Sequence, residues 1–471
     1  LCHASYLIGS GREAAVIDPR RDVDLYLRAA EAQELKITHV ILTHFHADFV
    51  AGHLELANRL GAQIVMGAPA TPKFAFRGMA EGEVLKIGNL GLKFYLTPGH
   101  TLEGVCIFVP SISESEPPKL FTGDTLFIGE VGRPDLFASR ISAPEMAGML
   151  FDSLQKIMQL PDHTEIWPAH GAGSVCGRNI GSKEMDSIGN QKRTNYALRP
   201  MERVEFIRLV SGNLPLAPDY FPQNARINQR GAPSVDSVKQ GVSFLSPDKF
   251  ETASRRDQSV ILDVRSPDEF ASGHIQGAVN IGLDGQFALW VGTMIPFESK
   301  VLIVAPPDRG EEAITRLTRT GYDQIAGILG GGVSAWQGAG KPLTLTRRVS
   351  AEALRAQLLG QRSLFGGHRG VNLLDVRRPA ETEGGVIDAS VLTIPLNELY
   401  RRLEEIPLDT PLVIYCAAGY RSSIAASMLR KIHPEAEITD LIGGYGAWLA
   451  KGIATVQLKS GVSKKSSVSG P

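Results

Sequence analysis

The sequence is poor in cysteine, has no long apolar run and carries no excess of charge of one sign. Four cysteines in 471 residues are too few and too scattered for a disulfide framework, which favours a reduced compartment such as the cytoplasm. Lysine and arginine number 49 against 50 aspartates and glutamates, so no global basic field exists to hold nucleic acid or an anionic membrane. No apolar run approaches the roughly 18 residues that span a bilayer. We therefore expect a cytoplasmic protein without nucleic-acid or membrane partners, and a homo-oligomer stays open.

The length of the chain predicts several domains, because single cores stop growing well below 471 residues. Residues 1–180 read as short apolar strands, at 14–18, 38–43, 63–66 and 92–96, with helical spacing over Asp24–Leu35 and Asp48–Leu60. Residues 199–241 are punctuated by prolines and poor in periodicity, which indicates a connector packed over the first domain. The first domain with its connector is therefore predicted to span residues 1–240.

The rest of the chain contains an internal duplication. The run ILDVR at 261–265 recurs as LLDVR at 373–377, and GGVSAW at 331–336 recurs as GGYGAW at 443–448. Both pairs are 112 residues apart, which is domain-sized spacing. In each copy apolar strands alternate with helical patterns, so we expect two α/β domains with parallel sheets, at 241–345 and 346–457. The polar tail at 458–471 is predicted to be disordered.

Four histidine and aspartate clusters in the first domain indicate a metal site. They are THFHADF at 43–49, TPGHT at 97–101, GD at 123–124 and PAHG at 168–171. Each cluster follows a strand-like run, so all four are expected on loops that converge on one rim. Imidazole and carboxylate groups are the ligands that first-row divalent metals accept.

These clusters resemble the metallo-β-lactamase superfamily, whose signature is HxHxDH followed by a later His, an Asp and a final His. The resemblance covers residues 1–180 and implies an αββα sandwich. This sequence has Phe49 where hydrolytic members carry the last His of HxHxDH. Because a phenyl ring cannot bind a metal, the second metal site of those hydrolases is expected to be absent.

Within the superfamily the pattern is most similar to the persulfide dioxygenases of the ethylmalonic encephalopathy protein type. This resemblance implies that His44, His100 and Asp124 hold one Fe(II) per chain. Two histidines and one carboxylate form the facial triad of non-haem iron oxygenases, which leaves positions open for a persulfide and for O₂.

Four further residues are expected to lie around these three ligands without binding the metal themselves. His46 and Asp48 are interpreted as hydrogen-bond partners of the ligands, and His170 as a pocket residue or another such partner. Cys176 is interpreted either as a small buried thiol or as a holder of sulfane sulfur near the iron.

In the last domain, the apolar strand at 412–415 runs directly into Cys416 and a helical pattern. A strand–loop–helix of this kind aims backbone N–H groups at the sulfur and stabilises a thiolate or persulfide anion. The CxxGxRS loop and the DVR and GGYGAW motifs together resemble rhodanese, which implies that Cys416 is the nucleophile and that Arg421 adds positive charge. The remaining loop residues would bind the transferred sulfur: Ala417, Ala418, Gly419, Tyr420 and Ser422.

The middle copy reads VAPPD at 304–308 in place of the cysteine loop, and no cysteine lies between Gly177 and Tyr415. Without a thiol there is no persulfide intermediate, and two prolines remove N–H donors from any anion cradle. Residues 241–345 are therefore expected to be a rhodanese-like domain without activity and with a structural role.

Together these features predict oxidation of a small-molecule persulfide by O₂ to sulfite, coupled to sulfur transfer on Cys416 that makes or uses thiosulfate. One alternative is a zinc-dependent thioester hydrolase of the glyoxalase II type fused to a sulfurtransferase. Another is a sulfur carrier without catalytic activity. The thiol that carries the persulfide stays open and could be glutathione, coenzyme A, bacillithiol or another thiol.

Overall fold

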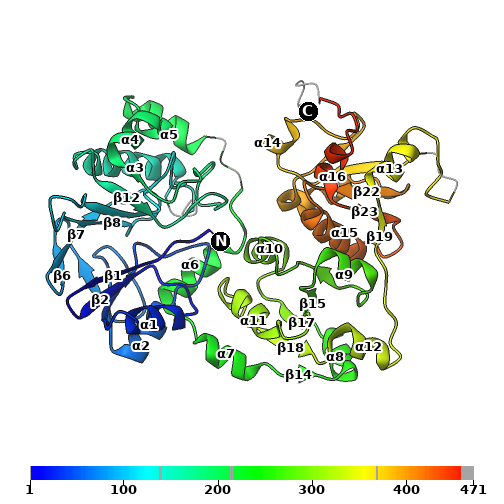
Figure 1. Ribbon diagram of the computed structural model, residues 1–471, viewed down its shortest axis with the longest axis horizontal. Coiled ribbons are helices and arrows are strands. Elements are labelled where there is room, and N and C mark those ends of the chain that lie inside the picture. Colours follow the sequence, from blue (N-terminus) through cyan, green and yellow to red (C-terminus); the bar gives the residue numbers. More distant parts are fainter. Residues whose placement is uncertain (1, 137–140, 213, 215, 367–369, 458–471) are drawn as a thin grey trace, which may run out of the picture. The chain divides into compact units, whose positions relative to one another are not determined.

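The computed structural model describes residues 2–136, 141–212, 214, 216–366 and 370–457, which fall into two compact units (Figure 1). The first unit contains the chain up to Val242 together with Ala288–Phe297 and Ile314–Gln324. The second contains Ser243–Phe287, Glu298–Ala313 and the chain from Ile325 onward. The tail at 458–471, predicted to be disordered, lies outside the described residues.

Two sheets form the centre of the first unit. One has the order β1-β2-β3-β4-β5, with β1 and β2 antiparallel and the other neighbours parallel. The other has the order β13-β12-β9-β8-β7-β6, and a short hairpin of β10 and β11 follows β9. The strands are β1 (Tyr6–Ser10), β2 (Glu13–Ile17), β3 (Lys36–Ile41), β4 (Gln63–Gly67), β5 (Arg77–Met79), β6 (Val84–Ile87), β7 (Leu90–Leu96), β8 (Val105–Val109), β9 (Lys119–Gly123), β10 (Leu126–Phe127), β11 (Glu130–Val131), β12 (Glu165–Pro168) and β13 (Asp186–Ser187).

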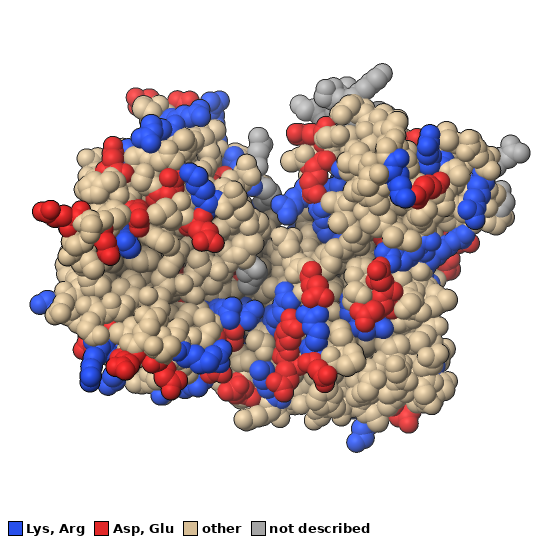
Figure 2. Space-filling model, viewed as in Figure 1, with Lys and Arg blue, Asp and Glu red and all other residues tan. Residues whose placement is uncertain are grey.

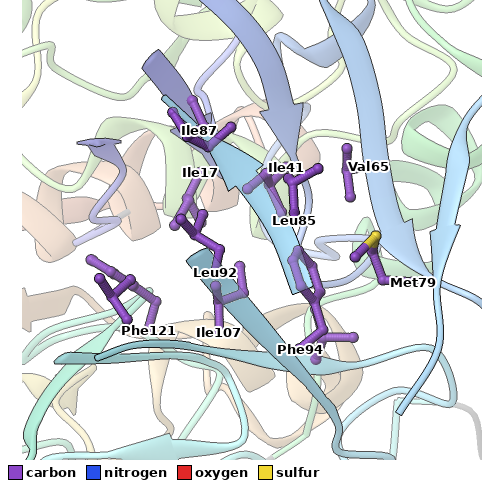
Figure 3. Close-up of a cluster of buried hydrophobic side chains, with 13 residues drawn as sticks. Ile17, Ile41, Val65, Met79, Leu85, Ile87, Leu92, Phe94, Ile107 and Phe121 are labelled. Carbon is purple, nitrogen blue, oxygen red and sulfur yellow. The ribbon is translucent and has the colours of Figure 1, made fainter. Parts of the chain in front are cut away.

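The hydrophobic core of this unit lies between the two sheets (Figure 3). Ile17, Ile41 and Val65 from the first sheet meet Phe94 and Ile107 from the second, and all five are buried. The sequence neighbours of these residues in β2, β3 and β4 are buried as well, because the other face of the first sheet is also covered. Helices cover the outer faces: α1 (Asp24–Glu31) and α2 (His53–Leu60) on the first sheet, and α3 (Ala143–Ile157), α4 (Ile188–Thr194), η1 (Tyr196–Leu198) and α5 (Arg203–Ser211) on the second (Figure 1). The predicted αββα sandwich is confirmed.

The segment interpreted as an irregular connector is largely helical. It contains α5, α6 (Phe221–Arg230) and α7 (Val235–Gly241). The buried positions of α6 are Phe221, Asn224, Ile227 and Asn228, a stripe at helical spacing in which two of the four residues are polar. The mixed polarity of this stripe hid the helix from a search for apolar periodicity.

The second unit repeats one topology twice. Its first sheet has the order β14-β18-β17-β15-β16 and its second the order β19-β23-β22-β20-β21, with every neighbouring pair parallel. Numbered within each copy, the two orders are identical, which confirms the duplication and the parallel sheets. The strands are β14 (Phe244–Leu245), β15 (Ser259–Asp263), β16 (Val279–Asn280), β17 (Lys300–Val304), β18 (Ile325–Leu329), β19 (Arg347–Val349), β20 (Asn372–Asp375), β21 (Leu392–Thr393), β22 (Leu412–Tyr415) and β23 (Ile438–Leu441).

Helices connect the parallel strands of both copies, as crossover connections require. In the first copy they are α8 (Pro247–Ser254), α9 (Pro267–Ser272), α10 (Phe287–Met294), α11 (Gly310–Thr318) and α12 (Gly332–Gly338). In the second copy they are α13 (Ala351–Leu358), α14 (Pro379–Thr382), η2 (Leu396–Glu405), α15 (Tyr420–Ile432) and α16 (Gly444–Ala450).

The surface agrees with the charge balance of the sequence. On the face shown in Figure 2, acidic and basic side chains of the described residues are interspersed, as expected for a net charge of −1. Within the described part of the chain, no helix combines the length and apolar character needed to cross a bilayer.

Candidate functional site

His44, His46 and Asp48 lie on the loop between β3 and α2. Asp18, at the end of β2, orders the start of this loop: one carboxylate oxygen accepts the Thr43 N–H and the other the Thr43 hydroxyl, both at 2.7 Å. The loop thus begins at a buried carboxylate, and the following side chains turn into the unit.

His44, His100 and Asp124 converge from three separate loops. Their ligand atoms lie within 4.8 Å of one another, and all three side chains are buried. Asp124 Oδ2 is 3.8 Å from His44 Nε2 and 3.4 Å from His100 Nε2. The far side of each imidazole is held by the protein: His100 Nδ1 donates to the Arg133 carbonyl at 2.9 Å, and His44 Nδ1 lies 3.0 Å from the Thr43 hydroxyl. Both Nε2 atoms are therefore directed toward the carboxylate.

The donor set fits a divalent cation. His100 Nε2 and Asp124 Oδ2 are buried and have no hydrogen-bond partner among the described residues, an arrangement that costs free energy unless a ligand is present. Burial lowers the pKa of His44 and of His100, which keeps the imidazoles neutral as metal binding requires. Burial alone would raise the pKa of Asp124, but His170 and His44 outweigh it and hold this pKa well below its usual range.

His170 lies between two carboxylates. Its Nδ1 is 2.7 Å from Asp124 Oδ1 and its Nε2 is 2.9 Å from Asp48 Oδ2. Burial opposes protonation, yet the two carboxylates raise the pKa of His170 well above its ordinary value. Because both ring nitrogens are engaged, His170 orients Asp124 from behind, which agrees with its interpretation as a hydrogen-bond partner.

Cys176 lies beside this pair. One ligand atom each from Asp48, His170 and Cys176 falls within 4.8 Å of the others. Burial, and next the Asp48 charge, raise the pKa of the thiol well above its ordinary value, so Cys176 is a neutral thiol here. The sequence did not predict that these three groups would meet.

Phe49 is 1% exposed and packs between two imidazoles. Its ring centroid is 4.0 Å from that of His3 and 4.4 Å from that of His46. His46 Nε2 in turn lies 3.0 Å from Asp18 Oδ1. Phe49 thus fills its position with hydrocarbon, and His46 faces a structural carboxylate.

Asn228 in α6 holds the loop between β3 and α2 that carries His44, here called the ligand loop. No local motif in the sequence marked Asn228. Its amide donates to the carbonyls of His46 at 2.8 Å and Phe49 at 2.7 Å, and its carbonyl accepts the Ala51 N–H at 2.8 Å. Tyr220, immediately before α6, was also missed. It packs with Cys176 in one buried cluster, and its hydroxyl has no hydrogen-bond partner among the described residues.

The second constellation lies at the end of β22, where Cys416 opens the predicted loop. Cys416 is 1% exposed, and its Sγ accepts the Gly419 N–H at 3.1 Å. Gly419 has φ of +96°, a conformation that glycine adopts without strain, and α15 begins at the next residue. The strand–loop–helix geometry is therefore confirmed.

The GGYGAW turn closes over this loop. The N–H of Tyr445 donates to the Cys416 carbonyl at 2.7 Å, and that of Gly446 to the Ala417 carbonyl at 2.8 Å. A Cβ on Gly444 would lie 2.3 Å from the Cys416 carbonyl oxygen, so the approach requires glycine. The motif thus positions the backbone that carries the thiol.

Arg377 of the DVR motif and Arg421 of the cysteine loop are each paired with a carboxylate. Arg377 forms a buried ion pair with Asp375 and lies 3.8 Å from the Tyr445 ring centroid. Arg421 makes a bidentate pair with Glu381, at 2.7 and 2.6 Å, and this lowers the pKa of Glu381 to about 2. The sequence predicted that Arg421 adds positive charge to the loop, and the structure shows that Arg421 is also paired with Glu381.

Comparison with known proteins agrees with this architecture. The family model of the metallo-β-lactamase superfamily matches residues 3–170, and that of the rhodanese-like domain matches residues 246–339 and 358–451. A hydroxyacylglutathione hydrolase from Rhodospirillum rubrum is 31% identical over 216 residues, which are 45% of this chain and 75% of that protein. The chain belongs to the metallo-β-lactamase superfamily.

Three further proteins are similar to smaller or larger parts of the chain. A hydroxyacylglutathione hydrolase from Synechococcus sp. is 33% identical over 164 residues, which are 34% of this chain and 60% of that protein. The chain thus spans less than two thirds of the length of this relative. A crystal structure of a metallo-beta-lactamase from Staphylococcus aureus is 32% identical, with a TM-score of 0.62, and covers 70% of this chain and 95% of its own. That likeness extends well beyond residues 3–170. The structure of ETHE1 from Myxococcus xanthus is 28% identical over 48% of this chain and 93% of its own, with a TM-score of 0.42.

Proposed function

We propose that the first domain oxidises a low-molecular-weight persulfide with O₂ at a single Fe(II) held by His44, His100 and Asp124. The observation that carries this proposal is the pairing of these three donors with a buried Phe49 where superfamily hydrolases have an imidazole. A two-metal hydrolase uses the second ion to generate hydroxide and to clamp the reacting oxygen. The engagement of both nitrogens of His170 by carboxylates further supports a one-metal centre.

The bound ferrous ion would supply open coordination positions and the redox chemistry of O₂. The protein residues orient the donors: Thr43 and the Arg133 carbonyl fix the two imidazoles, and His170 fixes Asp124. Overall, one persulfide anion, one O₂ and one water give a thiol, sulfite and a proton, so the outer sulfur is oxidised and O₂ is reduced.

The C-terminal domain would then handle sulfane sulfur on Cys416. The terminal sulfur of a Cys416 persulfide passes to sulfite, which forms the S–S bond of thiosulfate and releases the Cys416 thiolate, or the reaction runs in reverse. Gly419 N–H stabilises sulfur at this position. We assign residues 1–240 to the dioxygenase with its connector, 241–345 to the cysteine-free repeat and 346–457 to the catalytic repeat. The four cysteines of the whole chain are free thiols, which suits a cytoplasmic setting.

A zinc-dependent thioester hydrolase is the second candidate for the first domain. It is supported by the 31–33% identity to hydroxyacylglutathione hydrolases, whose name describes cleavage of a glutathione thioester. The cluster of Asp48, His170 and Cys176 also offers three further ligand types beside the first site.

Metal analysis combined with oxygen uptake separates the two candidates. Protein purified without oxygen should contain about one iron per chain and consume O₂ with glutathione, coenzyme A or bacillithiol persulfide. Two zinc ions per chain, thioester hydrolysis and no oxygen uptake would reject the dioxygenase. For the catalytic repeat, Cys416→Ser should abolish sulfur transfer from thiosulfate to cyanide but leave oxygen uptake intact. Sulfur loading on wild-type Cys416 without turnover would instead indicate a carrier.

A further inference from the structure

The cysteine-free repeat retains motifs that its own chemistry does not need. Asp263 and Arg265 form a buried ion pair, as Asp375 and Arg377 do in the catalytic repeat. In the cysteine-free repeat the carbonyls of Asp263 and Arg265 accept the side-chain amide of Asn280, at 3.1 and 2.9 Å. The retained motif therefore holds one asparagine in a defined orientation.

Asn280 bonds in turn to α15 of the catalytic repeat. Its side-chain oxygen accepts the Ser423 hydroxyl at 2.7 Å, and its backbone N–H donates to the Ser427 hydroxyl at 3.0 Å. All three residues are at most 5% exposed. Buried hydrogen bonds of this kind are costly to break, so they hold the helix in one place.

A second contact reaches the catalytic loop itself. The hydroxyl of Tyr420 donates to the carbonyl of Gly282 in the cysteine-free repeat at 2.7 Å. The Tyr420 ring packs over Gly285, where a Cβ would lie 2.4 Å from two ring carbons. The turn at 282–285 thus packs directly against the Tyr420 ring, and position 285 has room only for glycine.

Tyr420 is the first residue of α15 and directly follows Gly419, whose N–H donates to the Cys416 sulfur. Tyr420, which contacts the cysteine-free repeat, is therefore bonded directly to Gly419, whose amide contacts the Cys416 sulfur. A displacement of the ring would be transmitted to this amide, and misplacement by about 1 Å can lower a rate by about a hundredfold.

We propose that the cysteine-free repeat is a positioning element of the sulfurtransferase site. Asn280 fixes α15 and the 282–285 turn fixes Tyr420, so that the loop amides stay directed at the Cys416 sulfur. This inference rests on the proposed role of Cys416. Tyr420, Asn280 and Gly285 are positioning residues, since they act through the loop rather than on the sulfur.

Gly285→Ala in the full-length protein tests the proposal, with Gly338→Ala as the matched control. Both changes add one methyl group to the cysteine-free repeat, but a Cβ on Gly338 meets nothing within 4 Å. We expect Gly285→Ala to lower kcat for sulfur transfer from thiosulfate to cyanide about ten- to a hundredfold, with KM nearly unchanged. Gly338→Ala should match wild type. Equal kcat values for the two variants would overturn the proposal.

A double-mutant comparison distinguishes positioning from a general loss of structure. In a Tyr420→Ala background the ring is gone, so adding Gly285→Ala should have no further effect. A full additional loss in that background would overturn the proposal. Tyr420→Phe, which removes only the hydroxyl, should lower kcat severalfold with an unchanged unfolding temperature, and an unchanged kcat would count against the Gly282 contact.

Alkylation of Cys416 gives a readout that does not depend on turnover. The rate of its modification by iodoacetamide, followed by peptide mass spectrometry, should differ between Gly285→Ala and Gly338→Ala. If wild type shows no sulfur transfer, the proposed function of Cys416 fails, whereas this rate comparison still tests the positioning. Identical alkylation rates would reject the positioning in either case.

Discussion

Replacing Asn228 with alanine should weaken both the fold of the first unit and its proposed metal centre. The side chain is completely buried and makes three hydrogen bonds of 2.7–2.8 Å to the backbone of the ligand loop. The substitution would leave the carbonyls of His46 and Phe49 and the N–H of Ala51 without this partner. An unpaired buried polar group costs about 1–3 kcal/mol, and partial relaxation of the loop reduces the sum, so we expect a loss of about 3–5 kcal/mol.

This loss should be measurable in two ways. At about 2–4 °C per kcal/mol, the unfolding temperature of the metal-free protein should fall by about 6–20 °C. Metal affinity, measured by competition with a chelator, should fall about 10- to 100-fold, because the loop that carries His44 is no longer held. Asn228→Asp keeps the acceptor for Ala51 but lacks the amide donors, so it should not restore stability.

Arg226→Ala on the same helix is the matched control. Arg226 is exposed, so its replacement should change the unfolding temperature and the metal affinity little. If Asn228→Ala behaved like Arg226→Ala in both assays, α6 would not be what holds the loop between β3 and α2.

Three further predictions follow from buried side chains. Phe49→His should raise the bound metal from about one ion toward two per chain in elemental analysis, because it restores an imidazole beside Asp48; unchanged stoichiometry would contradict this reading. Tyr220→Phe should stabilise the protein by about 1 kcal/mol in urea unfolding, because it removes a buried hydroxyl without a partner among the described residues, whereas destabilisation would reveal a partner. Burial raises the pKa of Asp440 from 3.8 to about 6, so the protonated carboxyl favours the folded state. This contribution to the free energy of unfolding, about 3 kcal/mol, is fully present below about pH 4 and is lost as pH rises through 6. Asp440→Asn should remove that dependence from unfolding temperatures recorded between pH 4 and 7, and a slope equal to wild type would disprove it.

The sequence was informative wherever a residue type and its local spacing are sufficient for the chemistry. The histidines and Asp124 follow strand-like runs, and loops at strand ends commonly carry catalytic residues, so their convergence on one rim was predicted. The sequence did not predict that the rim joins loops of both sheets, with His44 after β3 of the first and Asp124 after β9 of the second. The strand before Cys416 was predicted at the residues where β22 lies, since β-branched residues run straight into a glycine loop. The repeat offset of 112 residues also predicted two sheets of equal topology.

Local spacing was misleading where a loop has helix-like periodicity. Residues 48–60 were predicted as one helix, yet α2 begins at His53. The preceding residues are held in a loop by distant partners: the N–H of Val50 donates to the Arg319 carbonyl at 2.8 Å, and that of Gly52 to the Pro19 carbonyl at 2.9 Å. A loop of irregular backbone needs hydrogen-bond partners for its N–H groups, and here those partners lie far away in sequence.

The residues that the sequence did not reveal share one property: their role is defined by a partner more than a hundred positions away or outside any motif. Asn228 bonds to residues 177–182 positions earlier. Tyr420 was predicted as a loop residue that binds the transferred sulfur, but its bond to a carbonyl 138 positions earlier was not predicted. A polar residue on a helix is ordinarily solvated, so nothing in its own neighbourhood distinguishes Asn228 from an exposed asparagine. Likewise, the pairing of Arg421 with Glu381 was not predicted, because Glu381, 40 positions away, lies outside the CxxGxRS loop. The proposed ligands and nucleophile thus stand out in short motifs, whereas the residues that orient them become visible only when the chain is folded.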